Sequence, residues 1–315
     1  MIVVTGEYGQ LGNRLIVFAN LIAAAQEHGL RVANPAFHAY AELFEGTRGD
    51  PLCRYPRVRS WLPAGRRTRE AMHAALDTAR RYIRRLRRRT GVLPPFLRTL
   101  EIGWERRCDL DGPEFLEPAR RAGLLLVRGW RFRAERSFER HAEAIRTFFA
   151  PAEPQRARIA AGVRELRRGV DLLVGVHIRQ GDYRTFLGGR FYHPTRHYAA
   201  LLRGLRREFE GRRVRFVPCS NEPQDATAFD GVDVACGPGD VLGDLYTLAA
   251  CDYLVAPPST YSMWASFYGE TPLYTLLDPQ RTPTRADFAV VRNFVRSGED
   301  HMRQPAPAVA AAQCR

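Results

Sequence analysis

The feature that most constrains the fold is the regular alternation of apolar strands and helices in the second half of the chain. Strands are expected at 172–177, 214–218 and 253–256, and helices at 195–210 and 242–250. Strands separated by helices of this length pair in parallel, and a parallel sheet is covered on both faces. The sequence therefore predicts an α/β protein whose ligands bind at the carboxyl ends of its strands.

The first thirty residues have the same character. The apolar run 2–5 predicts a strand, residues 6–13 predict a glycine-containing turn, and the stretch that ends near Gly29 predicts a helix. Free backbone N–H groups at the start of such a helix favour an anion. Many turns of this kind, however, hold glycine for backbone geometry alone.

Two prolines, at 151 and 154, follow a helical stretch from Phe138 to Phe149 and predict a domain boundary. We expect an N-terminal domain at 1–153 and a C-terminal domain at 154–280. The remaining segment, 281–315, is expected to hold one more helix, over 288–295, and a mobile tail rich in alanine and proline.

Segment 66–89 is the most basic part of a chain whose net charge is +14, with ten arginines against Glu70 and Asp77. Its apolar residues recur at helical spacing and predict one stripe of an amphipathic helix, namely Met72, Leu76, Ala79, Ile83 and Leu86. Such a helix either docks on an anionic membrane surface or packs its stripe on its own domain, and the sequence leaves both open.

A non-enzymatic protein that binds polyanions or nucleic acid through 66–89 is the alternative from another class. Nucleic acid is not expected as a partner, because apart from Tyr82 this segment lacks the aromatic residues that stack on bases. The longest apolar run, 15–25, is too short to span a bilayer, and no export leader is expected. We expect a cytoplasmic protein, with peripheral contact at the inner face of the membrane if segment 66–89 docks there.

Four polar clusters lie where expected strands end or helices begin. In the first, 177–183, the guanidinium of Arg179 can bind phosphate oxygens or form a structural salt bridge with Asp182. The second is the turn 9–13. The third, 256–264, carries hydroxyl groups that cap a helix or bind phosphate. The fourth is Asp244, whose carboxylate can accept two N–H groups of guanine or cap a helix.

Together these segments resemble the fucosyltransferases that use GDP-fucose, especially the bacterial α-1,2 type (glycosyltransferase family 11-like), with kinship to α-1,6 and protein O-fucosyltransferases. The matching segments are Gly-x-x-Gly-Asn at 9–13, His-x-Arg-x-Gly-Asp-Tyr at 177–183, Ser-Asn-Glu at 220–222, Asp244, and Ser-Thr-Tyr-Ser-Met-Trp at 259–264. The resemblance implies a GT-B-like α/β fold with two Rossmann-like domains facing a central cleft. It also implies inverting transfer from the nucleotide-sugar donor GDP-fucose, without a metal or other cofactor, to a glycan acceptor such as a surface polysaccharide or lipid-linked oligosaccharide.

The resemblance further implies roles for single residues. Arg179 corresponds to the arginine that binds the pyrophosphate, Asn13 to the asparagine that approaches the β-phosphate, and Asp244 to the aspartate that reads guanine. The implied donor-binding set is Gly12, Asn13, His177, Arg179, Ser220, Asn221, Asp244, Ser259, Thr260 and Ser262. The chain departs from the family at Gln180, where many relatives have a second arginine, and at Pro257-Pro258. Another nucleotide sugar is therefore the alternative donor.

Transfer to a hydroxyl group also needs a base or a hydrogen-bond acceptor near it. The candidates are Glu7, Asp182 and His193; we prefer Glu7, because Asp182 is expected to orient Arg179. No metal site is expected, since the cysteines and histidines show no ligand spacing. The pair Asp109-Leu-Asp111 matches a metal-binding motif of other glycosyltransferases, but no apolar strand precedes it.

Overall fold

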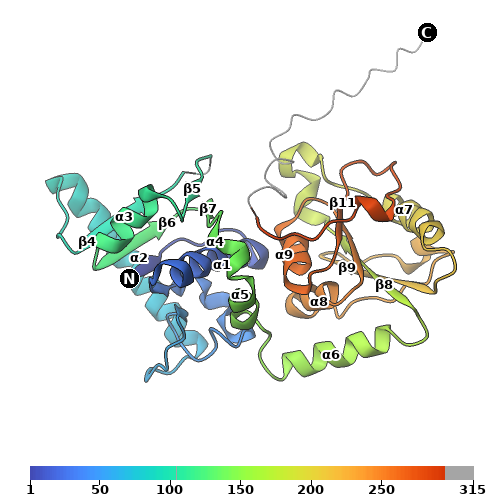
Figure 1. Cartoon of the computed structure of the whole chain (residues 1–315), viewed down its shortest axis with the longest axis horizontal. Helices are drawn as coiled ribbons and strands as arrows, with labels where there is room; N and C mark the ends of the chain where they lie inside the picture. Colours follow the sequence, from blue (N-terminus) through green and yellow to red (C-terminus); the bar gives the residue numbers. More distant parts are fainter. Residues whose placement is uncertain (104, 295–315) are drawn as a thin grey trace, which may run out of the picture. The chain divides into compact units, whose positions relative to one another are not determined.

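The computed structural model describes residues 1–103 and 105–294. The chain divides into two compact units, Met1–Ala160 (unit 1) and Ala161–Arg315 (unit 2), and both contain strands and helices (Figure 1). The division falls within helix α6 (Gln155–Leu166), beyond the boundary expected from the prolines. Each unit is built on a largely parallel sheet, which confirms the predicted α/β class.

Unit 1 contains a five-stranded sheet in the order β3-β2-β1-β6-β4. Its strands are β1 (Ile2–Val4), β2 (Val32–Ala33), β3 (Arg54–Tyr55), β4 (Leu97–Glu101) and β6 (Leu124–Arg128). Only the β2–β3 pair is antiparallel among these described strands. β1 is central, with Ile2 opposite both Val32 and Leu125. The turn that leaves β1 therefore lies in the middle of the carboxyl edge of the sheet.

Helix α1 (Leu11–His28) follows this turn and ends at Gly29, whose left-handed φ of 65° closes the helix as the sequence predicts. Most of α1 is buried, because it packs against an aromatic cluster that includes Phe37 and Phe149. The remaining elements of unit 1 are η1 (Pro35–Leu43), β5 (Cys108–Asp109), α3 (Pro113–Arg121), β7 (Phe132–Arg133), α4 (Ser137–Arg140) and α5 (Ala142–Phe148). The expected helix 138–149 is thus two short helices that meet at His141.

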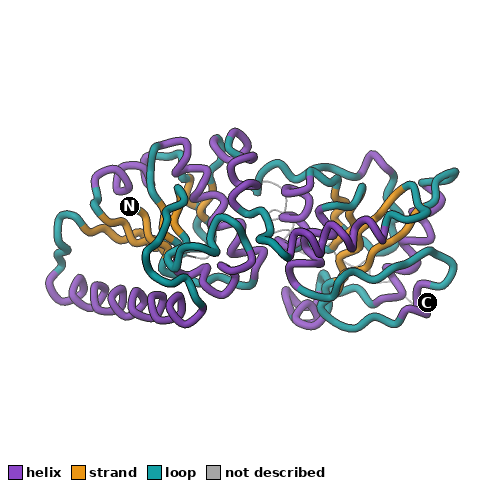
Figure 2. Tube along the Cα trace, turned by 90° about the horizontal axis from the view of Figure 1, so that it is seen from below, coloured by secondary structure: helices purple, strands orange, loops and turns teal. Residues whose placement is uncertain are grey.

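The basic segment forms helix α2 (Arg66–Thr90), which ends at Gly91 and runs along one side of unit 1 (Figure 2). Ile83 packs on the buried cluster of Val3, Ala33, Leu97 and Leu126, so part of the apolar stripe contacts its own unit. Four residues of the predicted stripe, Met72, Leu76, Ile83 and Leu86, are partly buried, whereas Ala79 is exposed. The two fully buried residues of α2 are arginines, Arg69 and Arg80. Among the described residues, every helix is too short or too polar to pass through a lipid bilayer.

Unit 2 contains a parallel sheet in the order β11-β10-β8-β9. Its strands are β8 (Leu172–Ile178), β9 (Val214–Ser220), β10 (Tyr253–Ala256) and β11 (Leu273–Thr275), and its main helices are α7 (Thr195–Glu208), α8 (Val241–Ala249) and α9 (Thr260–Gly269). Short 3-10 turns follow β8 (η2, Gly181–Arg184; η3, Phe186–Gly189) and β9 (η4, Ala226–Phe229), and another, η5 (Arg285–Asp287), lies after β11. The strands and helices predicted between residues 172 and 256 are confirmed, and β11 is an addition.

The central strand β8 presents different residues to its two faces. Val174, Val176 and Ile178 join the buried cluster that contains Tyr198 and Leu202 of α7. Gly175 faces the other way, because a Cβ atom there would meet Leu248 of α8 and Leu254. Since side chains alternate along a strand, His177 lies on the same face as Gly175, toward α8 and α9.

The helix expected over 288–295 is wrong for its described part, 288–294, which has no helical residues. Instead, Ala289 forms an antiparallel bridge with Leu273, and the Val291 N–H donates to Ser266 Oγ. Phe294 stacks on Trp264. These tertiary contacts outweigh the local apolar pattern. Residues 295–315, which include the expected tail, lie outside the described residues.

Gly175 provides a test of this packing. A Cβ atom on Gly175 would lie 2.7 Å from methyl groups of Leu248 and Leu254. We predict that Gly175→Ala lowers the free energy of unfolding by about 1–3 kcal/mol through overpacking, measured by urea denaturation. The control is Gly162→Ala in α6, where the new methyl group would meet no described atom within 4 Å other than those of its chain neighbours and of the nearby backbone of its own helix. Equal stabilities of the two variants would contradict the packing described here.

Candidate active site

The loop that leaves β8 holds Arg179 from two sides. Its Nη2 donates to Asp182 Oδ2 at 2.9 Å, and its guanidinium carbon lies 5.6 Å from the centre of the Tyr183 ring. The side chain of Arg179 is 21% exposed, compared with 58% for Asp182. Asp182 therefore contacts Arg179 as an orienting residue should.

The salt bridge leaves part of the guanidinium available. Within the described residues, Nε and Nη1 of Arg179 donate no hydrogen bond. Because Arg179 is also partly exposed, these donors can bind an oxyanion from solvent. The salt bridge and the phosphate site, which the sequence left as alternatives, are thus compatible in one side chain.

Gln180 and the end of β9 support this loop. Asn221 accepts from the Gln180 N–H at 2.8 Å, and Gln224 Nε2 donates to both Gln180 Oε1 and Ser220 Oγ. Gly181 has a φ of 57°, and a Cβ atom there would lie 2.8 Å from Asn221 Nδ2. The structure therefore places Ser220 and Asn221, which were predicted to bind the donor, in the scaffold that fixes the backbone beside Arg179.

His193, one of the candidate bases, lies inside unit 2. It is 4% exposed, and its carbonyl oxygen accepts from Gln180 Nε2 at 3.2 Å. Burial lowers the pKa of its imidazole. The structure contradicts a role for His193 at an acceptor hydroxyl, because the side chain does not reach the surface.

Tyr183 connects the end of β8 to the start of α9. Its hydroxyl donates to the Pro258 carbonyl oxygen at 2.6 Å. Ser259 is the N-cap of α9, where its Oγ accepts from the Tyr261 N–H. Ser262 donates to the Ser259 carbonyl oxygen and is 1% exposed. Ser259 therefore caps the helix, which was one of the two roles expected of these hydroxyl groups. Ser262 is buried, and Thr260 is the first residue of the helix.

His177 lies behind Arg179 on the face of the sheet that α9 covers. Its ring centre is 5.0 Å from that of Tyr261, whose hydroxyl donates to the Val241 carbonyl oxygen. Burial, with a smaller effect of the Arg179 charge, lowers the pKa of His177 to about 3. The imidazole is therefore neutral at physiological pH.

Asp244 lies in the first turn of α8 but does not cap it. The cap is Asp240, whose side chain accepts from the Gly243 N–H. Asp244 Oδ1 instead accepts from the Gly239 N–H at 2.8 Å, and Asp244 is 7% exposed. Burial raises the pKa of this carboxyl. Its orientation is thus fixed from the loop before the helix.

In unit 1, the turn after β1 brings Asn13 against Gly9. Gly9 has a φ of 55°, and a Cβ atom there would lie 2.0 Å from Asn13 Nδ2. Gly12 is buried in the first turn of α1, and the N-cap residue, Gln10, forms no side-chain capping bond. Gly9 therefore has both a conformational and a steric reason to be glycine.

Glu7 is the centre of a cluster that the sequence did not reveal. His38 Nε2 from η1 and His73 Nε2 from α2 both lie 2.9 Å from Glu7 Oε1, and Arg14 Nη2 donates to Oε2 at 2.8 Å. The two imidazole rings stack with centres 4.7 Å apart. Partial burial raises the pKa of Glu7, but the hydrogen bond from His38 and the charge of Arg14 outweigh it and lower the pKa.

The sequence shows no ligand spacing among the histidines, because His38 and His73 come together only in the folded chain. The ligand atoms of Glu7, His38 and His73 all lie within 4.8 Å of one another, and two imidazoles with one carboxylate suit a divalent transition metal. The separations of 2.9 Å are hydrogen-bond distances. That the protein needs no metal stays a prediction, which full activity in EDTA would support.

Asp111 of the Asp-Leu-Asp pair is a structural residue. It is 5% exposed and accepts from the backbone N–H groups of Arg136 and Ser137 and from the Ser137 hydroxyl. His28 Nε2 lies 3.0 Å from its Oδ1. These contacts leave no reason to assign a metal to this pair.

Comparison with known proteins bears on the fold. No family model matches the sequence, and no curated protein matches it. The structure is similar to a mutant of Arabidopsis thaliana FUT1 in complex with GDP, with a TM-score of 0.59 and 14% identity over 91% of this chain and 73% of that chain. The structure is also similar to POFUT1 in complex with GDP-fucose, with a TM-score of 0.54 and 10% identity over 90% of this chain and 95% of that chain. For fucosyltransferase NodZ from Bradyrhizobium, the TM-score is 0.51 and the identity 18%, over 90% of this chain and 99% of that chain. These likenesses confirm the predicted GT-B-like α/β fold.

The burial of His177 makes stability depend on pH. Its pKa falls from an ordinary value of 6.5 to about 3 in the folded protein, so its contribution is complete above pH 6.5 and is lost as the pH falls toward 3. We predict that His177→Gln makes the loss of stability between pH 6.5 and pH 4 shallower, by up to about 1.4 kcal/mol per pH unit. Urea denaturation at several pH values measures the slope. If the free energy of unfolding changed with pH in the same way in the wild type and in His177→Gln, the prediction would be contradicted.

Proposed function

We propose that this protein is a glycosyltransferase that transfers fucose from GDP-fucose to a sugar hydroxyl of a glycan. The observation that carries the proposal is Arg179, two of whose nitrogens donate to none of the described residues, at the carboxyl end of a central parallel strand. The sequence motifs around it resemble those of GDP-fucose-dependent enzymes, and the fold is that of structures solved with GDP or GDP-fucose.

The donor nucleotide is assigned to unit 2. Arg179 binds the pyrophosphate, and Asp244 accepts N–H groups of guanine, a pairing that adenine cannot offer. The support for Asp244 is that Asp240 already caps α8, so helix capping does not account for the carboxylate. The backbone N–H groups at the start of α9 and the Ser259 hydroxyl are the further donors near the phosphates.

Gln180 bears on the alternative donor. The family has a second arginine at this position, but Gln180 is 5% exposed and its side chain contacts His193 and Gln224 inside the loop scaffold. A change at a scaffold position need not change the nucleotide. GDP-fucose therefore stays the preferred donor over another nucleotide sugar.

The chemical step breaks the bond between fucose C1 and the β-phosphate oxygen. Negative charge grows on the departing phosphate while the sugar becomes oxocarbenium-like. A guanidinium already held by Asp182 and Tyr183 can stabilise that charge without reorganising. This gives Arg179 its catalytic role.

The acceptor hydroxyl is assigned to the Glu7 cluster of unit 1. Glu7 is ionised, and burial lowers the pKa of His73, so this imidazole is neutral at physiological pH. If its Nε2–H donates to Glu7, its Nδ1 can accept the proton of the sugar hydroxyl while Glu7 stabilises the imidazolium. Attack from the face opposite the leaving group inverts the β-linked donor to an α-linked product. We further propose a galactoside α-1,2 linkage, from the motif resemblance alone.

Replacing Arg179 tests the donor assignment. We predict that Arg179→Ala lowers kcat with GDP-fucose by roughly 100- to 1000-fold, because one charge-stabilising group is lost. Asp182→Asn keeps the shape of the side chain but weakens the orienting bond, and it should lower kcat less.

The nucleotide preference of the wild type tests donor binding separately from catalysis. GDP should raise the melting temperature of the wild type more than UDP or ADP does, since a ligand stabilises the folded state in proportion to RT ln(1 + [L]/Kd). Near-wild-type turnover by Arg179→Ala would remove the basis of the proposal.

Replacing Glu7 tests the proton acceptor formed by His73 and Glu7. We predict that Glu7→Gln lowers kcat by roughly 100-fold or more while the affinity for GDP is unchanged, because a neutral amide does not stabilise the His73 imidazolium and general-base catalysis contributes about 100- to 10,000-fold. Glu42→Gln is the control, since Glu42 pairs with buried Arg69 in the same unit. Steady-state kinetics over a range of pH measures kcat of both variants. An unchanged pH profile of kcat in Glu7→Gln would exclude the Glu7 cluster from accepting the proton.

A further inference from the structure

A large pocket lies in unit 1, outside both groups of residues used above. It lies between helix α2 and the edge strand β4 and has a volume of about 590 Å³. Its lining is Arg80, Ile83, Arg84, Arg87, Arg88, Thr99, Leu100 and Glu101. Four guanidinium groups therefore surround a space of the size that binds small molecules.

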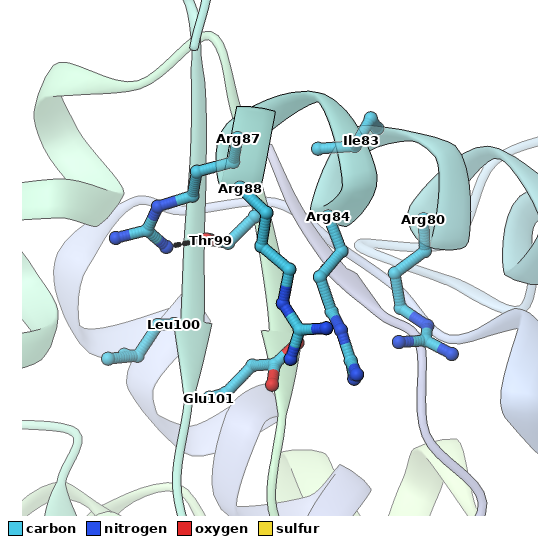
Figure 3. Close-up of a pocket in the computed structure, with 8 residues that line it drawn as sticks. All are labelled: Arg80, Ile83, Arg84, Arg87, Arg88, Thr99, Leu100 and Glu101. Carbon is cyan, nitrogen blue, oxygen red and sulfur yellow. Dashed lines mark hydrogen bonds between the residues drawn. The ribbon is translucent and has the colours of Figure 1, made fainter. Parts of the chain in front are cut away.

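The charged side chains of the pocket differ in how far they are engaged. Arg87 Nη1 donates to Thr99 Oγ1 at 2.8 Å, whereas Arg84 and Arg88 form no salt bridge within the described residues (Figure 3). Figure 3 shows the guanidinium groups of Arg80, Arg84 and Arg88 extending to the same side of α2. Such a set of cations at close range is unfavourable unless an anion neutralises it.

Arg80 gives an independent sign of a missing ligand. It is only 8% exposed, and its Nε and Nη2 both donate to Asp77 Oδ1. Its Nη1 is buried and has no hydrogen-bond acceptor among the described residues. A buried charged donor without an acceptor is costly, and an oxyanion in the pocket would supply one.

The face of α2 that lines the pocket also carries His73 of the Glu7 cluster. His73, Asp77, Arg80, Arg84 and Arg88 follow one another at steps of three or four residues, so they lie on one face of the helix. At a rise of about 1.5 Å per residue, Arg84 is roughly 17 Å along the helix from His73.

We propose that the pocket between α2 and β4 binds a phosphorylated sugar, and that this sugar is part of the glycan acceptor. The arginines bind the phosphate, for which a guanidinium fork is matched in shape and charge. Glu101 and Thr99 offer acceptors for sugar hydroxyl groups beside it. The face of α2 then leads the rest of the acceptor toward His73 and Glu7. The acceptor role rests on the proposed function; the binding of a sugar phosphate does not.

The test uses glucose 1-phosphate, with uncharged glucose as the comparison, and measures binding by isothermal titration calorimetry. We expect the double variant Arg84→Ala/Arg88→Ala to bind glucose 1-phosphate at least about tenfold more weakly than the wild type, because each lost charged hydrogen bond is worth about a factor of ten or more. The wild type should bind glucose 1-phosphate more tightly than glucose.

The matched control is Arg85→Ala/Arg89→Ala. It removes the same charge from the same helix, and its two arginines are exposed like Arg84 and Arg88 but lie outside the pocket lining. We expect its affinity for glucose 1-phosphate to stay within about twofold of the wild type, by the small effect expected of distant exposed charges. If the two double variants lost affinity for glucose 1-phosphate equally, the effect would be one of general charge, and the proposed binding site would be overturned.

A second arm separates a soluble sugar phosphate from a lipid surface. Trp61, Tyr82 and Phe96 are exposed near or on α2, with Trp61 at 90%, and they could insert into a membrane beside the arginines. Sedimentation with phosphatidylcholine vesicles, with and without phosphatidylglycerol, measures this. Binding to anionic vesicles that both double variants lose equally, without binding of glucose 1-phosphate, would overturn the proposal in favour of membrane docking.

A third arm separates this inference from the proposed function. Arg179→Ala should leave the pocket's affinity for glucose 1-phosphate unchanged, and Arg84→Ala/Arg88→Ala should leave the affinity for GDP unchanged. Loss of glucose 1-phosphate binding in Arg179→Ala alone would place the phosphate at the donor site and overturn the pocket. Failure of the wild type to bind GDP would instead contradict the proposed function and leave the pocket standing.

Discussion

The contact between Arg179 and Asp182 is the interaction on which the rest of the account depends. As an ion pair near the surface it contributes little to stability, since such pairs are worth about 1 kcal/mol or less. Its importance is positional, because together with the Tyr183 ring it holds the guanidinium in one place while two of its nitrogens donate to none of the described residues. An anion can then bind without first ordering the side chain, and this preorganisation is what stabilisation of a leaving group requires.

The surrounding sheet makes that position possible. β8 is buried between neighbours on both sides, and its alternation sends Val176 and Ile178 into the core under α7, while His177 faces α9. The loop after β8 is supported in turn by Asn221 from the end of β9 and by the Pro258 carbonyl before α9. Three strand ends thus fix one loop. In unit 1, the same logic places the turn with Glu7 at the end of central β1, where η1 and α2 each contribute a histidine.

The sequence was sufficient where local pattern decides the structure. Apolar runs predicted β1, β8, β9 and β10, and Gly29 the end of α1. The spacing of Arg179 and Asp182 offered their salt bridge as one of two alternatives. It was insufficient where packing between distant segments decides. His38 and His73 meet at Glu7 only because α2 packs on η1, and no spacing in the chain indicates this. Likewise, both Asp240 and Asp244 are suited to cap α8, and only the backbone geometry separates them. Residues 288–294 are not helical, because they form contacts with Leu273 and Ser266 instead.

The most direct test of the central claim is a crystal structure of the protein grown with GDP. The account predicts that the β-phosphate accepts hydrogen bonds from the Arg179 guanidinium, that Asp182 keeps its contact with Nη2, and that the guanine N1–H and N2–H groups donate to Asp244. GDP bound with its phosphates away from Arg179, or an Arg179 side chain that remains without any phosphate contact while the nucleotide is present, would contradict it.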